Sequence, residues 1–464
     1  MAYGERAREI AAELAMHFER GRDYQRAVRY LERAGKNAIR RSTHAEATLL
    51  LTKGLELLKL LPDTPEQLQQ EIRLQLALGW ALMATKGFAA PEVATAFFRA
   101  RELCRQVEDP HLLFSALNGE ATFYMGRAEL RTARDLAEQL LALAQHVQNH
   151  LFLQIAHQRL GEILYNLGEL APARFHLEQG IALCNSHPDR SLTLPVTDSG
   201  VNCLVIVALV LCALGYPDQA RQRSSEALRL AEALSYPPSQ ACAMACAIPL
   251  HLYRQEWQTA QEQAEALLTF SLEYGFPLRV AQGTINRGYV LVEQGYTEEG
   301  SAQIREGLAT YEATGAKQDW PGYLSGLAWA YGKMGRTDEG VAMLTEALEV
   351  VHKTGQRLYE TELSWLKGEL TLQKFQVSGS KFHVPNPQAE AEAEAYFLKA
   401  IDIARQQQAK SLELRAVTSL SRLWRQRGKA KEAHKMLAEI YGWFTEGFDT
   451  KDLQEAKALL EELG

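Results

Sequence analysis

The motifs that most often identify catalytic chemistry are missing from this sequence. A nucleotide-hydrolysing enzyme needs a glycine-rich loop of the form GxxxxGK[ST], whose backbone amides hold phosphate. The nearest segment, "RAGKNA" around Lys36, lacks the first glycine and the hydroxyl residue, and it falls within an expected helix. HExxH, GxSxG and paired CxxC motifs are absent as well. The sequence therefore favours a protein that is not an enzyme and that carries no metal or cofactor.

Two residue pairs have a spacing that could support metal or thiol chemistry. His146 and His150 stand four residues apart, as two metal ligands on one helical face would, but no third ligand lies near them and the segment has the character of a helix end. Cys242 and Cys246 share this spacing, and small cysteines packed on a buried helix are the commoner explanation. Ordinary packing or surface roles are expected for three further histidines: His17, His157 and His251.

One motif occurs twice along the chain. "GYTEEGSAQIREGL" begins at Gly295 and "GRTDEGVAMLTEAL" begins at Gly335. In the same phase, small residues recur at a constant interval, with two longer steps before Ala220 and Ala393. They are Ala133, Ala173, Ala220, Ala260, Gly300, Gly340, Ala393 and Ala433. Mostly apolar residues follow four and about eight positions later, which is one face of an amphipathic helix whose small first residue admits a close neighbour.

Each of these helices has another helix upstream of it. "HQRLGEILYNLG" and "LSGLAWAYGKMG" carry apolar residues at three-and-four spacing, and a glycine suited to a left-handed helix end separates the two helices of a unit. These glycines are Gly168, Gly215, Gly295, Gly335 and Gly428. One pair cannot bury its apolar stripe, whereas stacked pairs can, each repeat contacting only its neighbours. The pattern predicts an all-α solenoid of about ten helix pairs with a period of about 40 residues.

Changes in regularity divide the chain into four parts. Residues 1–109 are expected to form irregular helical repeats, and residues 110–375 form the regular repeats with a loop insertion near 184–200. Residues 376–392 are expected to form a surface loop and a helix start, and residues 393–464 a C-terminal repeat with a capping helix. The first insertion contains apolar residues and could fold over the solenoid. A tolerated insertion without function is the alternative for both long links.

Composition limits the compartment and the partner. The formal charge of −7 over 464 residues lacks the concentration of Lys and Arg that nucleic-acid binding needs. The most apolar segment, "GVNCLVIVALVLCALG" (200–215), is too short to span a bilayer and lies in the helical phase of its unit. The first residues, "MAYGERAREIAAELA", do not have the pattern of a signal peptide, and the six cysteines have no disulfide-framework spacing. We expect a cytoplasmic protein that binds neither nucleic acid nor a membrane.

The helix pairs resemble tetratricopeptide repeats, through Leu160 and Gly161, the turn glycines and the alanines of the second helices. The chain departs from the tetratricopeptide pattern in two ways. Its period is longer than that of the family, and the tryptophan that the family has early in the first helix is mostly absent. Five longer phrases resemble the C-terminal repeat region of bacterial predicted ATPases of the STAND class, many of which carry a class III adenylate or guanylate cyclase domain at the amino end. They are "GERAREIAAELAMHFERGRDYQRAVRYL", "LTKGLELLKLLPDTPEQ", "ALMATKGFAAPEV", "LGYPDQA" and "IYGWFTEGFDTKDLQEAKALLEEL". This resemblance implies a right-handed superhelical solenoid and, because Met1 falls where the repeats begin, the repeat region alone.

The same resemblance assigns an inner face. In tetratricopeptide-like arrays the first helix of each pair lines the concave side. Applied to the matching position of each first helix in this chain, the resemblance places the following residues on the inner side: Glu162, Leu209, Pro249, Tyr289, Trp329 and Glu369. Gln282, Ser325 and Lys333 are expected on the same wall as Tyr289 and Trp329. Two large aromatic side chains suit an anchor pocket for a partner, although both rings could instead pack between adjacent first helices.

The resemblance implies a non-catalytic module that binds a protein, a peptide or a small-molecule effector. It would be the sensor or scaffold arm of a STAND-type ATPase or cyclase, in which binding shifts the array and thereby the attached ATPase. The alternative is a free-standing adaptor of the same fold that bridges two proteins. The sequence does not name the ligand, because repeat proteins of one shape bind chemically different partners.

Overall fold

The computed structural model describes residues 10–186, 197–374 and 386–464, and these ranges are almost entirely helical, with no strand. The helices are α2 (Ala11–Arg20), α3 (Tyr24–Arg40), α4 (His44–Leu58), α5 (Pro65–Lys86), α6 (Pro91–Cys104), α7 (Pro110–Gly126), α8 (Leu130–Val147), α9 (His150–Asn166), α10 (Leu170–Ser186), α11 (Ser199–Leu214), α12 (Pro217–Leu234), α13 (Pro237–Tyr253), α14 (Trp257–Tyr274), α15 (Pro277–Glu293), α16 (Thr297–Ala313), α17 (Trp320–Lys333), α18 (Thr337–Thr354), η1 (Arg357–Tyr359), α19 (Glu360–Lys374), α20 (Pro387–Gln407), α21 (Lys410–Gln426), α22 (Ala430–Tyr441) and α23 (Lys451–Leu463). The all-α prediction is confirmed.

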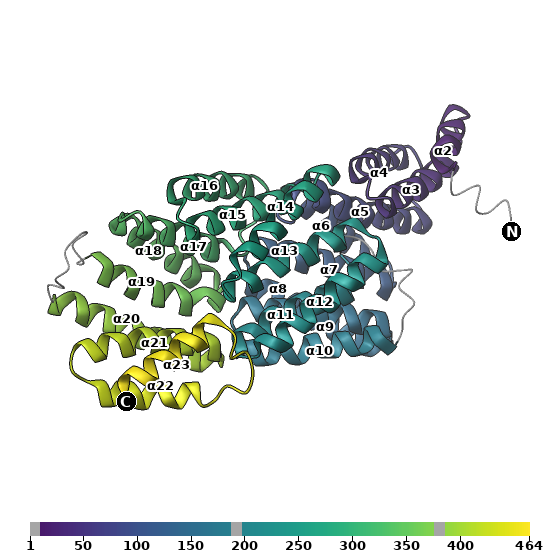
Figure 1. Ribbon diagram of the computed structural model, residues 1–464. Coiled ribbons are helices and arrows are strands. Elements are labelled where there is room, and N and C mark those ends of the chain that lie inside the picture. Colours follow the sequence, from purple (N-terminus) through teal and green to yellow (C-terminus); the bar gives the residue numbers. More distant parts are fainter. Residues whose placement is uncertain (1–9, 187–196, 375–385) are drawn as a thin grey trace.

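The helices form two layers (Figure 1). Consecutive helices pack against each other, and each odd-numbered helix from α3 to α21 also contacts the next odd-numbered helix. The odd-numbered helices therefore form the inner layer, and the even-numbered helices cover them from outside. In this arrangement every pair buries the apolar stripe of its neighbour. The predicted solenoid of helix pairs is confirmed.

The small residues that recur once in each repeat lie where the two helices of a pair approach most closely. The six alanines of this series are at most 1% exposed, and both glycines are buried. A Cβ added to Gly300 would lie 2.5 Å from the carbonyl oxygen of Gly288, on the partner helix. The predicted close approach of the two backbones is therefore confirmed at this pair.

Enlarging one of these positions should destabilise the fold. Ala173 is fully buried, and its carbonyl oxygen lies 3.3 Å from the place where a Cβ of Gly161 would be. We expect Ala173→Leu to overpack the α9–α10 pair and to lower the free energy of unfolding by about 1–3 kcal/mol. Ala171→Leu is the matched control, because Ala171 is exposed on the same helix. Equal melting temperatures for the two variants in a thermal scan would contradict the assigned phase.

The turns within the pairs have the predicted left-handed residue. Gly168, Gly215, Gly295, Gly335 and Gly428 have φ values between +74° and +99°. Ala128 and Gln255 occupy the same place in two other pairs, with φ of +60° and +59°. Links between pairs begin new helices with capping side chains: Asp109, Asn149 and Asp198 accept hydrogen bonds from backbone amides in the first turns of α7, α9 and α11.

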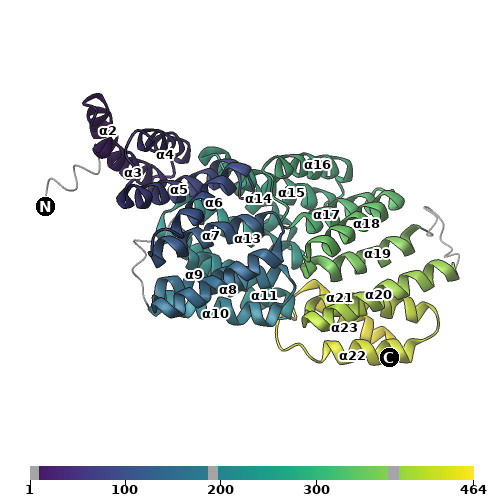
Figure 2. The same ribbon diagram turned by 180° about the vertical axis from the view of Figure 1, so that it is seen from behind.

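The array coils so far that segments distant in the sequence meet. The Ser411 hydroxyl donates to the Cys212 carbonyl at 2.7 Å, and the Lys317 amide donates to the Gly126 carbonyl at 2.8 Å. Near the C-terminus the Gly447 amide donates to the Asp218 carboxylate at 3.0 Å. Figures 1 and 2 show α20–α23 beside the middle of the array. The expectation that repeats contact only their neighbours is therefore wrong for this chain, because its superhelix closes on itself.

Helix α11 lies at the centre of this coil. It contains the most apolar segment of the sequence up to residue 214, and it contacts α9, α10, α12, α13 and α21. A helix that is apolar on all sides is stable in water only when other helices bury it on all sides. Within the described ranges, no helix has both the length and the hydropathy that crossing a membrane requires.

The two long links fall partly outside the described residues. Helix α10 ends at Ser186, and α11 is capped by Asp198, so the apolar part of the first insertion, at 187–196, is not described. In the second link residues 375–385 are not described, and α20 begins at Pro387, inside the range where a helix start was expected. The last helix, α23, packs on α21 and α22 and buries Leu453, Ala456 and Leu459, as a capping helix does.

Candidate binding cavities

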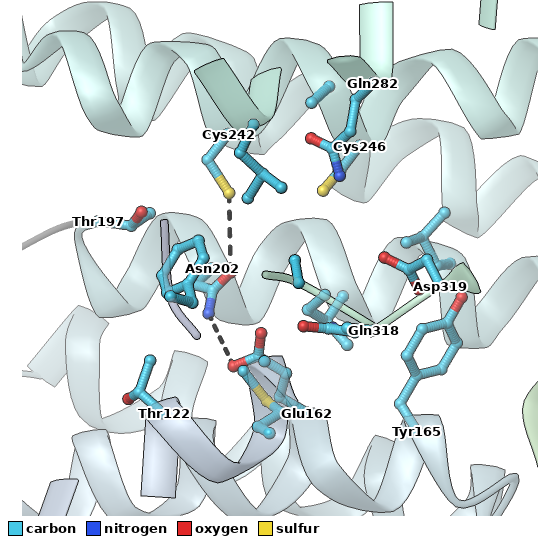
Figure 3. Close-up of a pocket in the computed structure, with 18 of the residues that line it drawn as sticks. Thr122, Glu162, Tyr165, Thr197, Asn202, Cys242, Cys246, Gln282, Gln318 and Asp319 are labelled. Atoms are coloured by element: carbon cyan, nitrogen blue, oxygen red, sulfur yellow. Dashed lines mark hydrogen bonds between the residues drawn. The ribbon is translucent and has the colours of Figure 1, made fainter. Parts of the chain in front are cut away.

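The inner layer encloses a cavity of about 280 Å³, which we call the central cavity. Most of its walls come from α5, α7, α9, α11, α13 and α15, and from the segment that leads into α17. Tyr311 of α16, Tyr323 of α17 and Tyr359 of η1 also line it. Trp80 and Tyr359 both line it, although they are far apart in sequence, because the coil closes around the space. Figure 3 shows Glu162 of α9, Asn202 of α11 and Cys242 of α13 pointing toward one another across it.

A buried network of polar side chains forms one wall of the central cavity. The Arg159 guanidinium donates to the Glu162 carboxylate at 2.9 Å, and the Gln158 and Asn202 amides donate to the same oxygen at 3.3 and 3.2 Å. The Cys242 thiol donates in turn to Asn202 Oδ1 at 3.8 Å (Figure 3). Burial lowers the pKa of Arg159. Because Arg159 also donates to Asn118, this network links four inner helices: α7, α9, α11 and α13.

Three other polar groups of the central cavity are less fully paired than this network. The Asn286 side chain is 8% exposed and makes no hydrogen bond to a described residue. Arg279 donates to Gln282 at 2.8 Å, but no carboxylate of the described residues lies within 4.0 Å of its guanidinium. Asp319 accepts from the Tyr359 hydroxyl at 2.8 Å, and burial raises the pKa of its carboxyl group. The cavity therefore offers unused donors and acceptors to a polar ligand.

A second cavity of about 290 Å³ lies further along the inner layer. Side chains from α13, α14, α15, α17, α19, α21 and α23 line it. Four of them are aromatic: Trp257, Tyr289, Trp329 and Trp365. The Trp329 indole donates to Glu293, and the Lys333 ammonium lies 4.6 Å from the centroid of the Trp329 ring. We call this space the aromatic cavity.

The residues predicted to face inward line these two cavities. Glu162, Leu209, Pro249 and Gln282 line the central cavity. Tyr289, Ser325, Trp329, Lys333 and Glu369 line the aromatic cavity. The expectation of one shared wall is wrong for Gln282, because α15 runs from one cavity to the other and Gln282 lies two turns before Tyr289. Both aromatic rings also pack against neighbouring helices, so their role in binding stays a prediction.

The other candidate residues do not assemble into a reactive site. His146 lies in the last turn of α8 and His150 begins α9. Within the described residues no group of three or more His, Cys, Asp or Glu side chains could hold a metal ion. His157 pairs with His176 at 3.0 Å, and His251 pairs with Glu256 at 2.6 Å. Lys36 lies within α3, as expected. Cys242 is buried and Cys246 half-buried, and both line the central cavity rather than only packing between helices.

The sequence pattern did not identify Arg279, Asn286 and Asp319 as residues that line the central cavity. Asn286 could have been found from the sequence. Asn118, Asn202 and Asn286 are evenly spaced, each two repeats after the one before, and all three line the central cavity. A search for polar residues in the phase of the inner helices would have found this row.

The sequence of the chain is similar to a known family and to one curated relative. The profile of the MalT-like TPR region matches residues 55–355. The relative, protein R02095 of Rhizobium meliloti (strain 1021), is 22% identical over 358 residues, which cover 75% of this chain and 34% of the relative. The chain thus spans about a third of the length of that relative.

Solved structures share the fold. The Rap protein complexed with Competence and Sporulation Factor superposes with a TM-score of 0.59 at 13% identity, over 82% of this chain and 98% of that one. A STAND protein with a tetratricopeptide repeat sensor from Pyrococcus horikoshii gives a TM-score of 0.43 at 16% identity, over 85% of this chain and 54% of that one. The profile of the MalT-like TPR region covers well over half of this chain, which therefore belongs to that family.

Proposed function

We propose that this chain is a non-catalytic binding module whose central cavity receives a segment of a partner protein or a peptide. The observation that carries this proposal is the Asn286 amide, which is nine-tenths buried, lines the cavity and has no hydrogen-bond partner among the described residues. The polar atoms of this amide are open to the cavity, so a ligand there can pair with them by a hydrogen bond. A side-chain amide both donates and accepts, as the peptide backbone does.

The row of asparagines extends this argument. Asn118 and Asn202 stand in the same phase as Asn286, on α7 and α11, so amide groups recur along the path that an extended segment would take across the inner helices. A protein of similar fold, Rap, was solved in complex with Competence and Sporulation Factor. A small-molecule effector is the alternative occupant, since about 280 Å³ is close to the size of a small-ligand pocket.

We also propose that the module is the sensor or scaffold arm of a larger cytoplasmic signalling protein of the STAND class. Support comes from the sequence phrases that resemble the repeat region of such ATPases, and from a relative about three times as long as the matched segment. The coding sequence upstream tests this directly. An in-frame P-loop ATPase supports the sensor arm, whereas its absence favours the free-standing adaptor.

Asn286→Leu tests the role of the central cavity. Leucine has a similar size but cannot form the hydrogen bond, so we expect the melting temperature to stay unchanged or rise, because no existing bond is lost. Retention of the partner from native cell extract, measured by quantitative pull-down, should fall at least tenfold. The matched control is Thr269→Leu, at an exposed position of α14. Equal capture by both variants, or by Asn286→Leu and the wild type, would overturn the proposal.

A further inference from the structure

The charges of the aromatic cavity do not balance. Five carboxylates and three cationic side chains line it. Three carboxylates lie in ion pairs: Glu293 with Lys333 at 3.8 Å, Asp452 with Arg415 at 2.8 Å, and Glu455 with Arg422 at 2.6 Å. The other two, Glu362 and Glu369, have no cationic group of the described residues within 4.0 Å.

The two remaining carboxylates share one face of α19. Glu362 and Glu369 stand seven residues apart, about two helical turns, and Trp365 lies between them on the same face. Burial raises the pKa of both carboxyl groups, against smaller opposing effects that include the charges of Arg415 and Arg422. Those two arginines are already neutralised by Asp452 and Glu455, so the α19 carboxylates face the cavity with their charge largely uncompensated.

The aromatic rings complete a site for a cation. Tyr289 of α15 and Trp329 of α17 line the cavity with Trp365, and the Trp257 and Tyr289 ring centroids are 6.4 Å apart. Cations already lie on two of these rings: Lys333 on Trp329 at 4.6 Å and Arg415 on Trp365 at 5.4 Å. Indole and phenol rings attract ammonium and guanidinium groups through the negative potential of their faces, most strongly where water is excluded.

We propose that the aromatic cavity binds an organic cation, a protonated amine or a guanidinium group, with Glu362 and Glu369 as its counter-ions and the aromatic rings as its walls. A volume of about 290 Å³ accommodates one lysine or arginine side chain. An anionic ligand would meet two more carboxylates than cations. The cation has two sources, a basic side chain of a bound partner or a free amine. This proposal deepens the proposed function. It depends on that function only in one respect, which is that the inner layer is the binding face.

The test uses the whole chain and small probes, without a partner. N-acetyl-lysine methylamide, N-acetyl-arginine methylamide and 1,4-diaminobutane are titrated by calorimetry and by tryptophan fluorescence, beside neutral N-acetyl-norleucine methylamide. We expect at least one cation to bind at least tenfold more tightly than the neutral probe and to change the fluorescence. Tighter binding of the capped amino acids identifies a partner side chain as the source, and tighter binding of the diamine identifies a free amine. Equal binding of neutral and cationic probes, or no binding, overturns the proposal.

The double variant Glu362→Gln/Glu369→Gln ties the cation to these carboxylates. A carboxyl group whose pKa is raised by folding opposes the folded state once it ionises, so at neutral pH the melting temperature should stay unchanged or rise. Cation affinity should fall at least tenfold. The control, Glu346→Gln/Glu349→Gln, removes the same charge from exposed positions of α18. Equal affinities in the two double variants contradict the site. Partner capture that still depends on Asn286 would then leave the proposed function standing.

Discussion

Replacing Arg159 by methionine is expected to lower the free energy of unfolding by about 3–5 kcal/mol, because it leaves a buried carboxylate without its counter-ion. The side chains of Arg159 and Glu162 are 8% and 10% exposed and their charged atoms are 2.9 Å apart. Gln158 and Asn202 would still donate to Glu162, but neutral amides do not compensate its charge. Urea denaturation followed by circular dichroism measures the effect.

Two further variants separate this cause from a simple loss of packing. In Arg159→Met/Glu162→Gln the uncompensated charge is gone, so most of the lost stability should return. Arg134→Met removes a cation that pairs with two exposed carboxylates, Glu138 and Glu169, and the loss of each pair should cost less than about 1 kcal/mol. An Arg159→Met chain as stable as the wild type, or a double variant as unstable as the single one, would show that Glu162 is not held by this pair.

Gly447→Val should detach the C-terminal helices from the middle of the array. Gly447 has φ of +75°, and a Cβ there would lie 2.1 Å from Cγ of Pro217. Its neighbour Glu446 accepts hydrogen bonds from the amides of Asp218 and Gln219 at 2.9 and 3.0 Å. A clash at this point breaks the closing contact, so we expect a larger radius of gyration in X-ray scattering and faster amide exchange over residues 211–220.

The backbone strain of this substitution has a matched control. Gly335 has φ of +74° and nothing within 4 Å of an added Cβ, so Gly335→Val carries the same left-handed strain, about 1–3 kcal/mol, without the clash. It should lower the melting temperature but leave the radius of gyration and the exchange at 211–220 unchanged. If both variants behave alike, the closing contact at Gly447 does not hold the coil together.

The helix pairs could be predicted from the sequence because they follow from local spacing, whereas the inner face was assigned by the resemblance to tetratricopeptide-like arrays. The regular recurrence of small residues set the phase, and the three-and-four spacing of apolar residues set the buried face of each first helix. The resemblance then placed the next position of each first helix on the inner side, and Trp329 and Glu369 line the aromatic cavity.

The closure of the coil could not be predicted in the same way. The rotation from one repeat to the next is a small angle, and its sum over several repeats decides whether Lys317 reaches Gly126. No residue type near either position signals that contact. For the same reason the single predicted wall divides into two cavities, with Gln282 and Tyr289 on the same helix but in different spaces.

The charged groups that line the two cavities escaped prediction for another reason. Whether Arg279 has a carboxylate near it depends on which helices meet in space, and an arginine near the start of a helix is usually solvated or paired. Glu362 and Glu369 keep excess charge because Asp452 and Glu455 pair with the nearby arginines. Asp452 and Glu455 come from α23, outside the helix pair that contains Glu362 and Glu369. Charge balance in a cavity is a property of the closed coil, so it becomes visible only in the structure.

Site-specific photocrosslinking tests most directly whether the inner face is the binding face. Benzoylphenylalanine is placed at Leu209, which lines the central cavity, and in a second chain at Leu272, which is 69% exposed on α14. Both chains are illuminated in native cell extract after their melting temperatures are shown to match the wild type. We expect a defined adduct from position 209 and none from position 272. Adducts of equal yield from both positions, or an adduct from position 272 alone, would contradict this expectation.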